Sequence, residues 1–185
     1  MRDQQSKYHL PNGDELIIRI PDITDAPAFL ANFQQLTKET DQLLLTHAES
    51  LDLDVKSERE FIASYLDDPD RLLLVAEVNG KIIGSVNFTH TGHTKKAHTG
   101  EMGIAIEKPW HNLGIGRRLI TILIRWAEAH PYLEIVFLQV YASNEKALQL
   151  YRNFGFQECG RLPQGIMLRP GVYTDLITMY RRIRP

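Results

Sequence analysis

The sequence lacks the features that mark several protein classes. It has one cysteine, Cys159, and no long apolar run. A single cysteine excludes an intramolecular disulfide and a zinc site built from several cysteines. No apolar stretch approaches the roughly 20 residues that a membrane-spanning helix requires. The N-terminal segment MRDQQSKYHLPNGDE also lacks the apolar core of a signal peptide. We therefore expect a cytoplasmic protein without a membrane partner.

An excess of positive charge is also missing, because the formal net charge is -2. Binding to nucleic acid needs a basic face that displaces counterions from phosphates, so no nucleic-acid partner is expected. The 43% hydrophobic and 24% charged residues are typical of globular proteins. A chain of 185 residues can bury one real core, and no repeat or linker divides it. We predict a single domain over residues 1–185.

Apolar periodicity and turn signals predict a mixed α/β fold. The expected elements, in chain order, are a strand over 15–21, a helix over 24–37, a helix from Ser57, a hairpin over 71–89, a strand over 100–107, a helix over 114–129, a strand over 134–142, a short helix ended by Gly155, and two closing strands. This order predicts a mixed central sheet of about seven strands, antiparallel in its N-terminal part and flanked by helices.

Two of these helices carry sharper expectations. Ser57 and Glu60 have the spacing of a capping box, which predicts a helix start at Ser57. The stretch over residues 39–53 stays open between helix and loop. The helix over 114–129 has apolar residues at helical spacing, which predicts a buried face made of Leu119, Ile122, Leu123 and Trp126.

A glycine-rich turn with Gly114 and Gly116 joins a strand directly to a helix. Glycines allow close approach of the backbone, and the first helical N–H groups lack internal partners, so this turn suits a phosphate. Arg117 and Arg118 lie at the helix end that disfavours cations, and a bound polyanion would explain them. The alternative is a tight turn with solvated arginines. A dinucleotide fold is disfavoured because Leu119 replaces its third glycine, and a P-loop lacks its Gly-Lys-Ser/Thr.

Two blocks of residues together point to one family. The first, His111-Asn112-Leu113-Gly114-Ile115-Gly116, is similar to the motif Gln/Arg-x-x-Gly-x-Gly/Ala. The second is similar to Asn-x-x-Ala-x-x-Leu-Tyr followed by Gly-Phe, and consists of Asn144, Ala147, Leu150, Tyr151, Gly155 and Phe156. With both blocks the chain resembles the GNAT (Gcn5-related N-acetyltransferase) superfamily over about residues 72–181. The resemblance implies the GNAT fold, acetyl-CoA as cosubstrate, and acetyl transfer to a primary amine. We expect no metal cofactor.

The resemblance also implies where the coenzyme binds. Main-chain groups at the strand end should pair with the pantetheine arm like an added strand, near a bulge that splays this strand from its neighbour. Backbone amides over 113–118 should hold the pyrophosphate. Asn144 should contact the pantetheine or phosphate region. The expected coenzyme site therefore comprises Ile104, Ala105, Ile106, His111, Asn112, Leu113, Gly114, Ile115, Gly116, Arg117, Arg118, Asn144 and Tyr151.

Two residues are catalytic candidates. The resemblance places the Tyr151 hydroxyl near the coenzyme sulfur, where it can protonate the leaving thiolate; the alternative is a tyrosine packed in the core. Strand alternation puts Glu101 on one face with the small residues Gly103 and Ala105, so Glu101 can relay a proton through water or be a solvated carboxylate. Some family members carry a glutamate base at the position of Gln139, and glutamine cannot act as a base.

Several polar groups have weaker assignments. His111 stands where the family usually has Gln or Arg, and its imidazole can still donate to a phosphate. His90, His93 and His98 are interpreted as a surface loop rather than a metal site. Thr46, His47 and Glu49 fall where the family's substrate-side helices lie, and we expect Tyr173 and Asp175 near the acceptor or at a homodimer contact.

The expected acceptor is a small-molecule amine or an amino acid. The alternatives are a protein N-terminus or lysine, or a non-catalytic module that senses acyl-CoA.

Overall fold

The structure is a computed structural model that describes residues 5–90 and 92–184. The described chain forms two compact units, each discontinuous in sequence. The first runs to Phe88 and resumes over Ile104–Leu123, and the second contains Thr89–Gly103 and the chain from Ile124 onward. The start of the polar N-terminal segment and Thr91 of the polar connection lie outside the described residues. That the chain is one domain stays a prediction.

The strands hydrogen-bond in the order β1-β2-β3-β4-β5-β6-β8-β7. Their bounds are β1 Ser6–His9, β2 Glu15–Arg19, β3 Leu72–Val78, β4 Lys81–Thr89, β5 Thr99–Ile106, β6 Ile135–Tyr141, β7 Gln157–Arg169 and β8 Val172–Arg182. The ladder between β5 and β6 is parallel, whereas the other described ladders are antiparallel. This confirms the mixed α/β class. The prediction of about seven strands missed β1, a short polar segment that is a strand only because it pairs with β2.

The helices are α1 Ala26–Glu39, α2 His47–Leu51, α3 Val55–Leu66, α4 Ile115–Ala129 and α5 Glu145–Asn153. Short 3₁₀ turns cover Ile23–Asp25, Thr94–Lys96 and Lys108–Trp110. In the part of the chain that the structure describes, no helix combines the length and hydropathy needed to cross a membrane.

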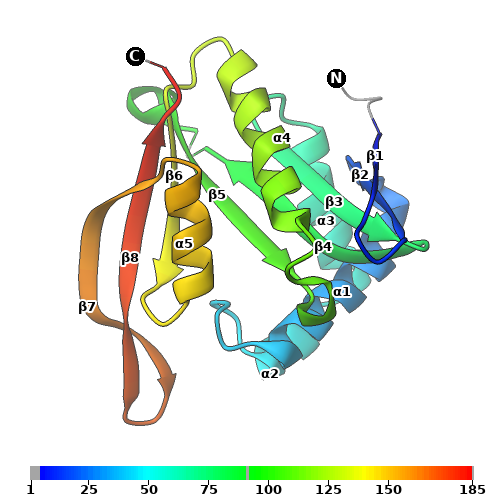
Figure 1. The fold of residues 1–185 in the computed structure, drawn as a ribbon, viewed down its shortest axis with the longest axis horizontal. Coiled ribbons are helices and arrows are strands. Elements are labelled where there is room, and N and C mark those ends of the chain that lie inside the picture. Colours follow the sequence, from blue (N-terminus) through cyan, green and yellow to red (C-terminus); the bar gives the residue numbers. More distant parts are fainter. Residues whose placement is uncertain (1–4, 91, 185) are drawn as a thin grey trace. The chain divides into compact units, whose positions relative to one another are not determined.

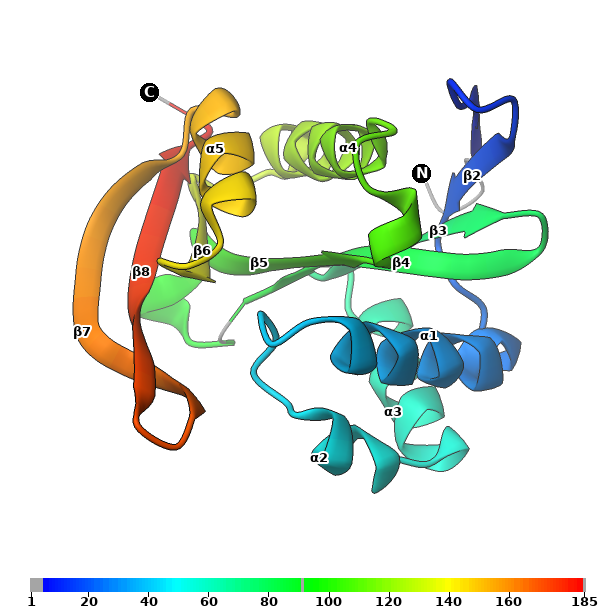
Figure 2. The same ribbon diagram turned by 60° about the horizontal axis from the view of Figure 1, so that its bottom comes forward.

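In the first unit, α1 and α3 pack together and cover β3 and β4 (Figure 2). Phe29 of α1 and Ile62 of α3 meet the strand residues Leu73, Val75 and Ile82 in a buried apolar cluster. The packing follows from sequence, because each helix places apolar residues on one face and the strands are apolar on both faces.

The start of α3 differs from its prediction. The cap is Asp54, whose carboxylate accepts from the Ser57 amide at 2.8 Å, while the Ser57 hydroxyl accepts from the Asp54 amide at 3.1 Å. Ser57 is therefore the third helical residue, and the Ser57–Glu60 capping box was wrong because Asp54 offers a strong acceptor three residues earlier. The ambiguous stretch 39–53 contributes α2.

The buried face of α4 is rotated from its prediction. Leu119 and Leu123 are buried as expected, whereas Ile122 and Trp126 are only half-buried. Four other residues complete the buried face: Ile115, Ile120, Ile124 and Ala127. The helix is apolar over more than half its circumference, so spacing alone did not fix which stripe faces the core.

In the second unit, β6 pairs with β8 over seven residue pairs, and α5 lies beside β6 in both views (Figures 1 and 2). Alternation along β6 buries Val136, Leu138 and Val140. The loop expected between the closing strands is instead the long end of β7. Three register shifts interrupt its ladder with β8 and accommodate turn-type residues within the strand. Those residues are why the sequence predicted a loop there.

Candidate active site

The turn that opens α4 lies in the first unit and has the backbone of an anion cradle. Asn112 and Gly114 adopt left-handed φ values of 64° and 81°. The Arg118 amide donates to the Gly114 carbonyl at 3.1 Å. Ile115 and Gly116 precede that bond, at the helix end where N–H groups lie before the first i to i−4 hydrogen bond. Glycine also has no side chain with which to cap them. This N-terminus therefore suits oxygen atoms of a phosphate or pyrophosphate.

Arg118 has a structural explanation that the sequence did not reveal. Its guanidinium lies 4.3 Å from the centre of the Tyr8 ring on β1, a cation–π geometry. Together with its amide bond to Gly114, this contact gives both polar parts of Arg118 a partner inside the first unit. A polyanion is therefore not needed to explain the position of Arg118. Arg117 is exposed in the same helical turn.

The end of β5 is held close to β4. A Cβ added to Gly84 would lie 2.6 Å from the Ala105 carbonyl oxygen and 2.9 Å from the Ile106 Cα, so only glycine permits this approach. The His111 Nε2–H donates to the Ile106 carbonyl at 2.8 Å. His111 thus fastens the turn to the strand end, a role that its expected phosphate contact did not include. The ladder between β5 and β6 covers Thr99–Glu101 and ends before Ile104.

A buried carboxylate follows this strand end, and sequence reasoning missed it. Glu107 is only 2% exposed and accepts hydrogen bonds from the Asn32 amide at 2.9 Å and the Lys81 ammonium at 2.7 Å. Its own backbone N–H donates to the Ile83 carbonyl at 2.9 Å. Asn32 lies 75 positions away in sequence, so no local signal in the sequence could have connected the two.

In the second unit, Tyr151 is on α5 and 7% exposed, and its ring meets Phe156 edge-on with centres 6.0 Å apart. Burial raises the pKa of Tyr151 to about 12. The hydroxyl is protonated at neutral pH, as that of an ordinary tyrosine is, and the raised pKa keeps the proton in place to higher pH. Core packing and a catalytic hydroxyl, the two alternatives given by the sequence, are compatible in this environment.

Asn144 is the N-cap of α5. Its side-chain oxygen accepts from the Ala147 amide at 3.1 Å. An asparagine amide has an acceptor oxygen and two donor hydrogens, and this cap uses the acceptor. A coenzyme phosphate or carbonyl would require the donors. Capping and the expected coenzyme contact are therefore chemically compatible.

Glu101 lies on β5 opposite Phe137 of β6. Its side chain reaches the surface, yet partial burial raises the pKa of the carboxyl above its ordinary value. A raised pKa makes the carboxylate a stronger base once it is ionised. Gln139 is exposed on β6 opposite Thr178.

The polar residues expected near the acceptor have structural partners. Thr46 and Glu49 cap α2 reciprocally, and hydrogen bonds from Thr46 hold the pKa of Glu49 below its usual range. His47 Nδ1 lies 3.2 Å from the Thr37 hydroxyl of α1. In the second unit, Asp175 accepts from the Gln164 amide at 2.9 Å and from Arg161 at 3.0 Å within the β7–β8 hairpin, while Tyr173 is exposed.

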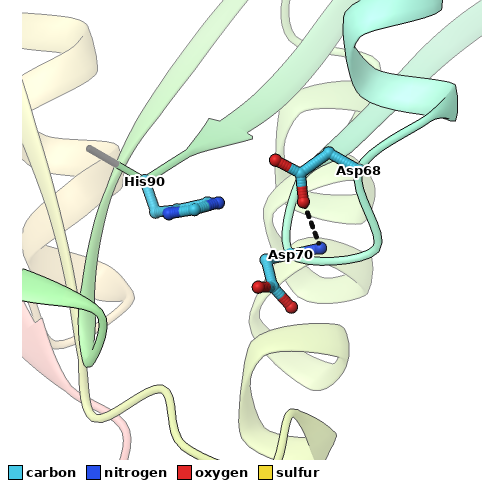
Figure 3. Close-up of side chains that lie close together, drawn as sticks. All are labelled: Asp68, Asp70 and His90. Carbon is cyan, nitrogen blue, oxygen red and sulfur yellow. Dashed lines mark hydrogen bonds between the residues drawn. The ribbon is translucent and has the colours of Figure 1, made fainter. Parts of the chain in front are cut away.

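The loop histidines have structural contacts. His90 Nδ1 accepts from the Gly92 amide at 3.0 Å, and the His93 and His98 carbonyls accept backbone hydrogen bonds. Figure 3 also shows, in the first unit, the turn in which the Asp70 amide donates to the Asp68 carboxylate at 2.9 Å. The absence of a bound metal stays a prediction.

Comparison with known proteins decides the family. The profile of the acetyltransferase (GNAT) family matches residues 36–156, well over half of the chain. The chain belongs to the acetyltransferase (GNAT) family. The family resemblance and the enzyme class expected from the two motif blocks are thereby confirmed.

Among its GNAT relatives, the L-amino acid N-acetyltransferase AaaT of Escherichia coli strain K12 is 26% identical over 115 residues, which cover 62% of this chain and 70% of that protein. An acetyltransferase of the GNAT family from Streptococcus pneumoniae has a TM-score of 0.86 and 29% identity, covering 90% of this chain and 99% of that chain. The yncA structure from Salmonella typhimurium, which contains acetyl-CoA, has a TM-score of 0.79 over 91% of this chain and 94% of that chain. Because the two sequences are only 19% identical, this likeness is one of fold alone.

Proposed function

We propose that this GNAT protein transfers an acetyl group from acetyl-CoA directly to a primary amine. The observation that carries the proposal is the turn at Gly114. Its left-handed backbone opens α4, which follows β5 and the 3₁₀ turn Lys108–Trp110, at the residues of the first motif block. A helix start preceded by glycine, which has no side chain of its own to act as a cap, suits the pyrophosphate of the coenzyme.

The coenzyme site follows from the motif residues. The amides over 115–117, with Leu113 and Gly114 before them, would hold the pyrophosphate. The main chain over 104–106 would pair with the pantetheine arm, which is consistent with a β5–β6 ladder that ends at Glu101. His111, Asn112, Arg117 and Asn144 supply side chains for the same ligand, while Arg118 contributes by holding the helix start against Tyr8.

The transfer needs three services from the protein. A typical aliphatic amine must lose a proton before it attacks, and Glu101 would accept that proton through water. The amine nitrogen then bonds to the thioester carbon, and a backbone N–H near Ile106 would stabilise the oxyanion. The carbon–sulfur bond breaks next, and Tyr151 would give its proton to the thiolate. The acetylated nitrogen would then release its remaining extra proton, which restores the Tyr151 hydroxyl. No covalent enzyme intermediate is required, and Cys159 takes no part.

We propose a small-molecule amine or an amino acid as the first acceptor class. The amino-acid activity named for the E. coli relative supports this choice. A protein N-terminus or lysine is the second class, and acyl-CoA sensing without turnover is the non-enzymatic alternative. Homodimer formation, a cytoplasmic location and the absence of nucleic-acid and membrane partners stay predictions.

The test is thiol release from acetyl-CoA across amino acids, polyamines, aminoglycosides and short peptides, with a control lacking any amine. Mass spectrometry of the acetylated product identifies the acceptor. We expect turnover with one class and a product heavier by one acetyl group. Acetyl-CoA binding without turnover of any amine would favour the sensor, and failure to bind acetyl-CoA would refute the proposal.

A further inference from the structure

The end of β5 at Ile106 and Glu107 is contacted by α1, by β4 and by His111 of the turn before α4, all within the first unit. Glu107, the next residue, is buried and reaches Asn32 on α1 and Lys81 at the start of β4. Its amide donates to Ile83 of β4. The strand end is therefore tied to one helix and to the neighbouring strand by a single carboxylate and its backbone.

The segment after Glu107 is tied to the same helix. The Lys108 amide donates to the Glu39 carboxylate at the end of α1 at 2.6 Å. The Trp110 amide donates to the Glu107 carbonyl at 3.0 Å, and His111 returns to the Ile106 carbonyl. Ile106 is thus held through its own carbonyl and through the residue that follows it.

Burying a carboxylate is costly unless it is paired and hydrogen-bonded. Glu107 meets this condition with partners drawn from 26 and 75 positions away. An apolar residue would fill the same space without needing them. We therefore look for a role of Glu107 beyond packing, and the position of the neighbouring Ile106 is the candidate.

We propose that Glu107 is a positioning residue for the acetyl transfer. Resting on the proposed function, the inference is that the Asn32–Glu107–Lys81 network fixes the Ile106 amide where the oxyanion develops. Catalytic donors act through geometry, and a misplacement of about 1 Å can cost roughly 100-fold in rate. Glu107 itself touches no reacting atom.

The test is Glu107→Gln, with Glu77→Gln as its matched control. Glu77 also belongs to a partly buried ion pair in the first unit, with Arg19 at 2.8 Å, but it lies on β3. We expect Glu107→Gln to lower kcat roughly tenfold or more, with the acceptor KM changed less than about threefold. Glu77→Gln should keep kcat within about twofold. Lys81→Met should act in the same direction as Glu107→Gln, and the double variant should be no slower than the slower single variant.

Amide hydrogen exchange gives a readout independent of turnover. Glu107→Gln should speed exchange at the Glu107 amide and its neighbours, and Glu77→Gln should leave them unchanged. If both variants lower Tm alike while kcat and this exchange stay at wild-type values, Glu107 is only structural and the proposal fails. If the wild type acetylates no amine, the proposed function fails, and the exchange comparison still decides whether the network holds the strand end.

Discussion

Two helices of the chain, α4 and α5, each follow a strand, and the residues that precede them differ in whether they can cap the helix. At α5, the Asn144 side chain caps the helix by accepting from Ala147. At α4, the preceding residue is Gly114, which has no side chain to do so. One helix start is capped by the side chain of the residue before it, whereas at the other start that residue has no side chain. We propose a division of work in which the start of α4 would bind the coenzyme and α5 would carry a reacting side chain, Tyr151.

The largest effect that tests this division is expected for Tyr151→Phe. The change removes one oxygen from a buried ring and keeps its contact with Phe156. Losing a general acid should lower kcat by about 100-fold or more. Acetyl-CoA affinity, measured by calorimetry, should change less than about threefold. Because burial raises the pKa of Tyr151 to about 12, the wild-type rate should not decline up to about pH 10 through loss of this proton.

A large loss of affinity in Tyr151→Phe, with little change of kcat, would contradict the division. In that case Tyr151 would serve coenzyme binding and some other group would protonate the thiolate.

Gly114→Ala should have the next largest effect, on affinity. Left-handed backbone costs a residue with a Cβ roughly 1–3 kcal/mol, so the cradle should distort and acetyl-CoA affinity should fall about 10- to 100-fold. Gly13→Ala is the matched control, because Gly13 has φ 91° and equally open space around its Cα, but lies in the β1–β2 turn. Equal acetyl-CoA affinities for the two variants would contradict a role for the turn at Gly114 in coenzyme binding.

Glu101→Gln should lower kcat about tenfold, since a water-relayed base is replaced by a group that cannot accept the proton. Partial burial raises the pKa of Glu101, so its ionised form is disfavoured in the folded state. The wild-type rate should therefore fall on acidification at a pH above the ordinary carboxyl range, and this acidic limb should vanish in the variant.

The raised pKa of Glu101 also predicts the direction in which stability changes with pH. A folded-state pKa above the unfolded value means that stability is lost as pH rises through the folded pKa. Glu101→Gln should therefore keep or slightly raise Tm at neutral pH while it lowers the rate. A fall in both would indicate a structural role for Glu101.

These predictions depend on features that the sequence made available to very different degrees. The hairpin at Asn79-Gly80 and the turn before α4 have local signals, and both were predicted. Local signals failed where a distant partner decides the outcome. The segment β1 forms a strand because it pairs with β2, and the position of Arg118 is explained by its cation–π contact with Tyr8. The carboxylate of Glu107 is explained by groups far along the chain, which no spacing rule could supply.

The smallest expected effect concerns Asn144 and separates capping from binding. Asn144→Ala should cost about 1 kcal/mol of unfolding free energy, measured by urea denaturation, because α5 loses its cap. Asn144→Ser keeps an uncharged cap acceptor and should recover most of that stability. If the Asn144 amide also donates to acetyl-CoA, both variants should lose affinity by a few-fold, since a hydrogen bond contributes about 1 kcal/mol. If affinity follows stability and returns in Asn144→Ser, then Asn144 serves the helix alone and is removed from the proposed coenzyme site.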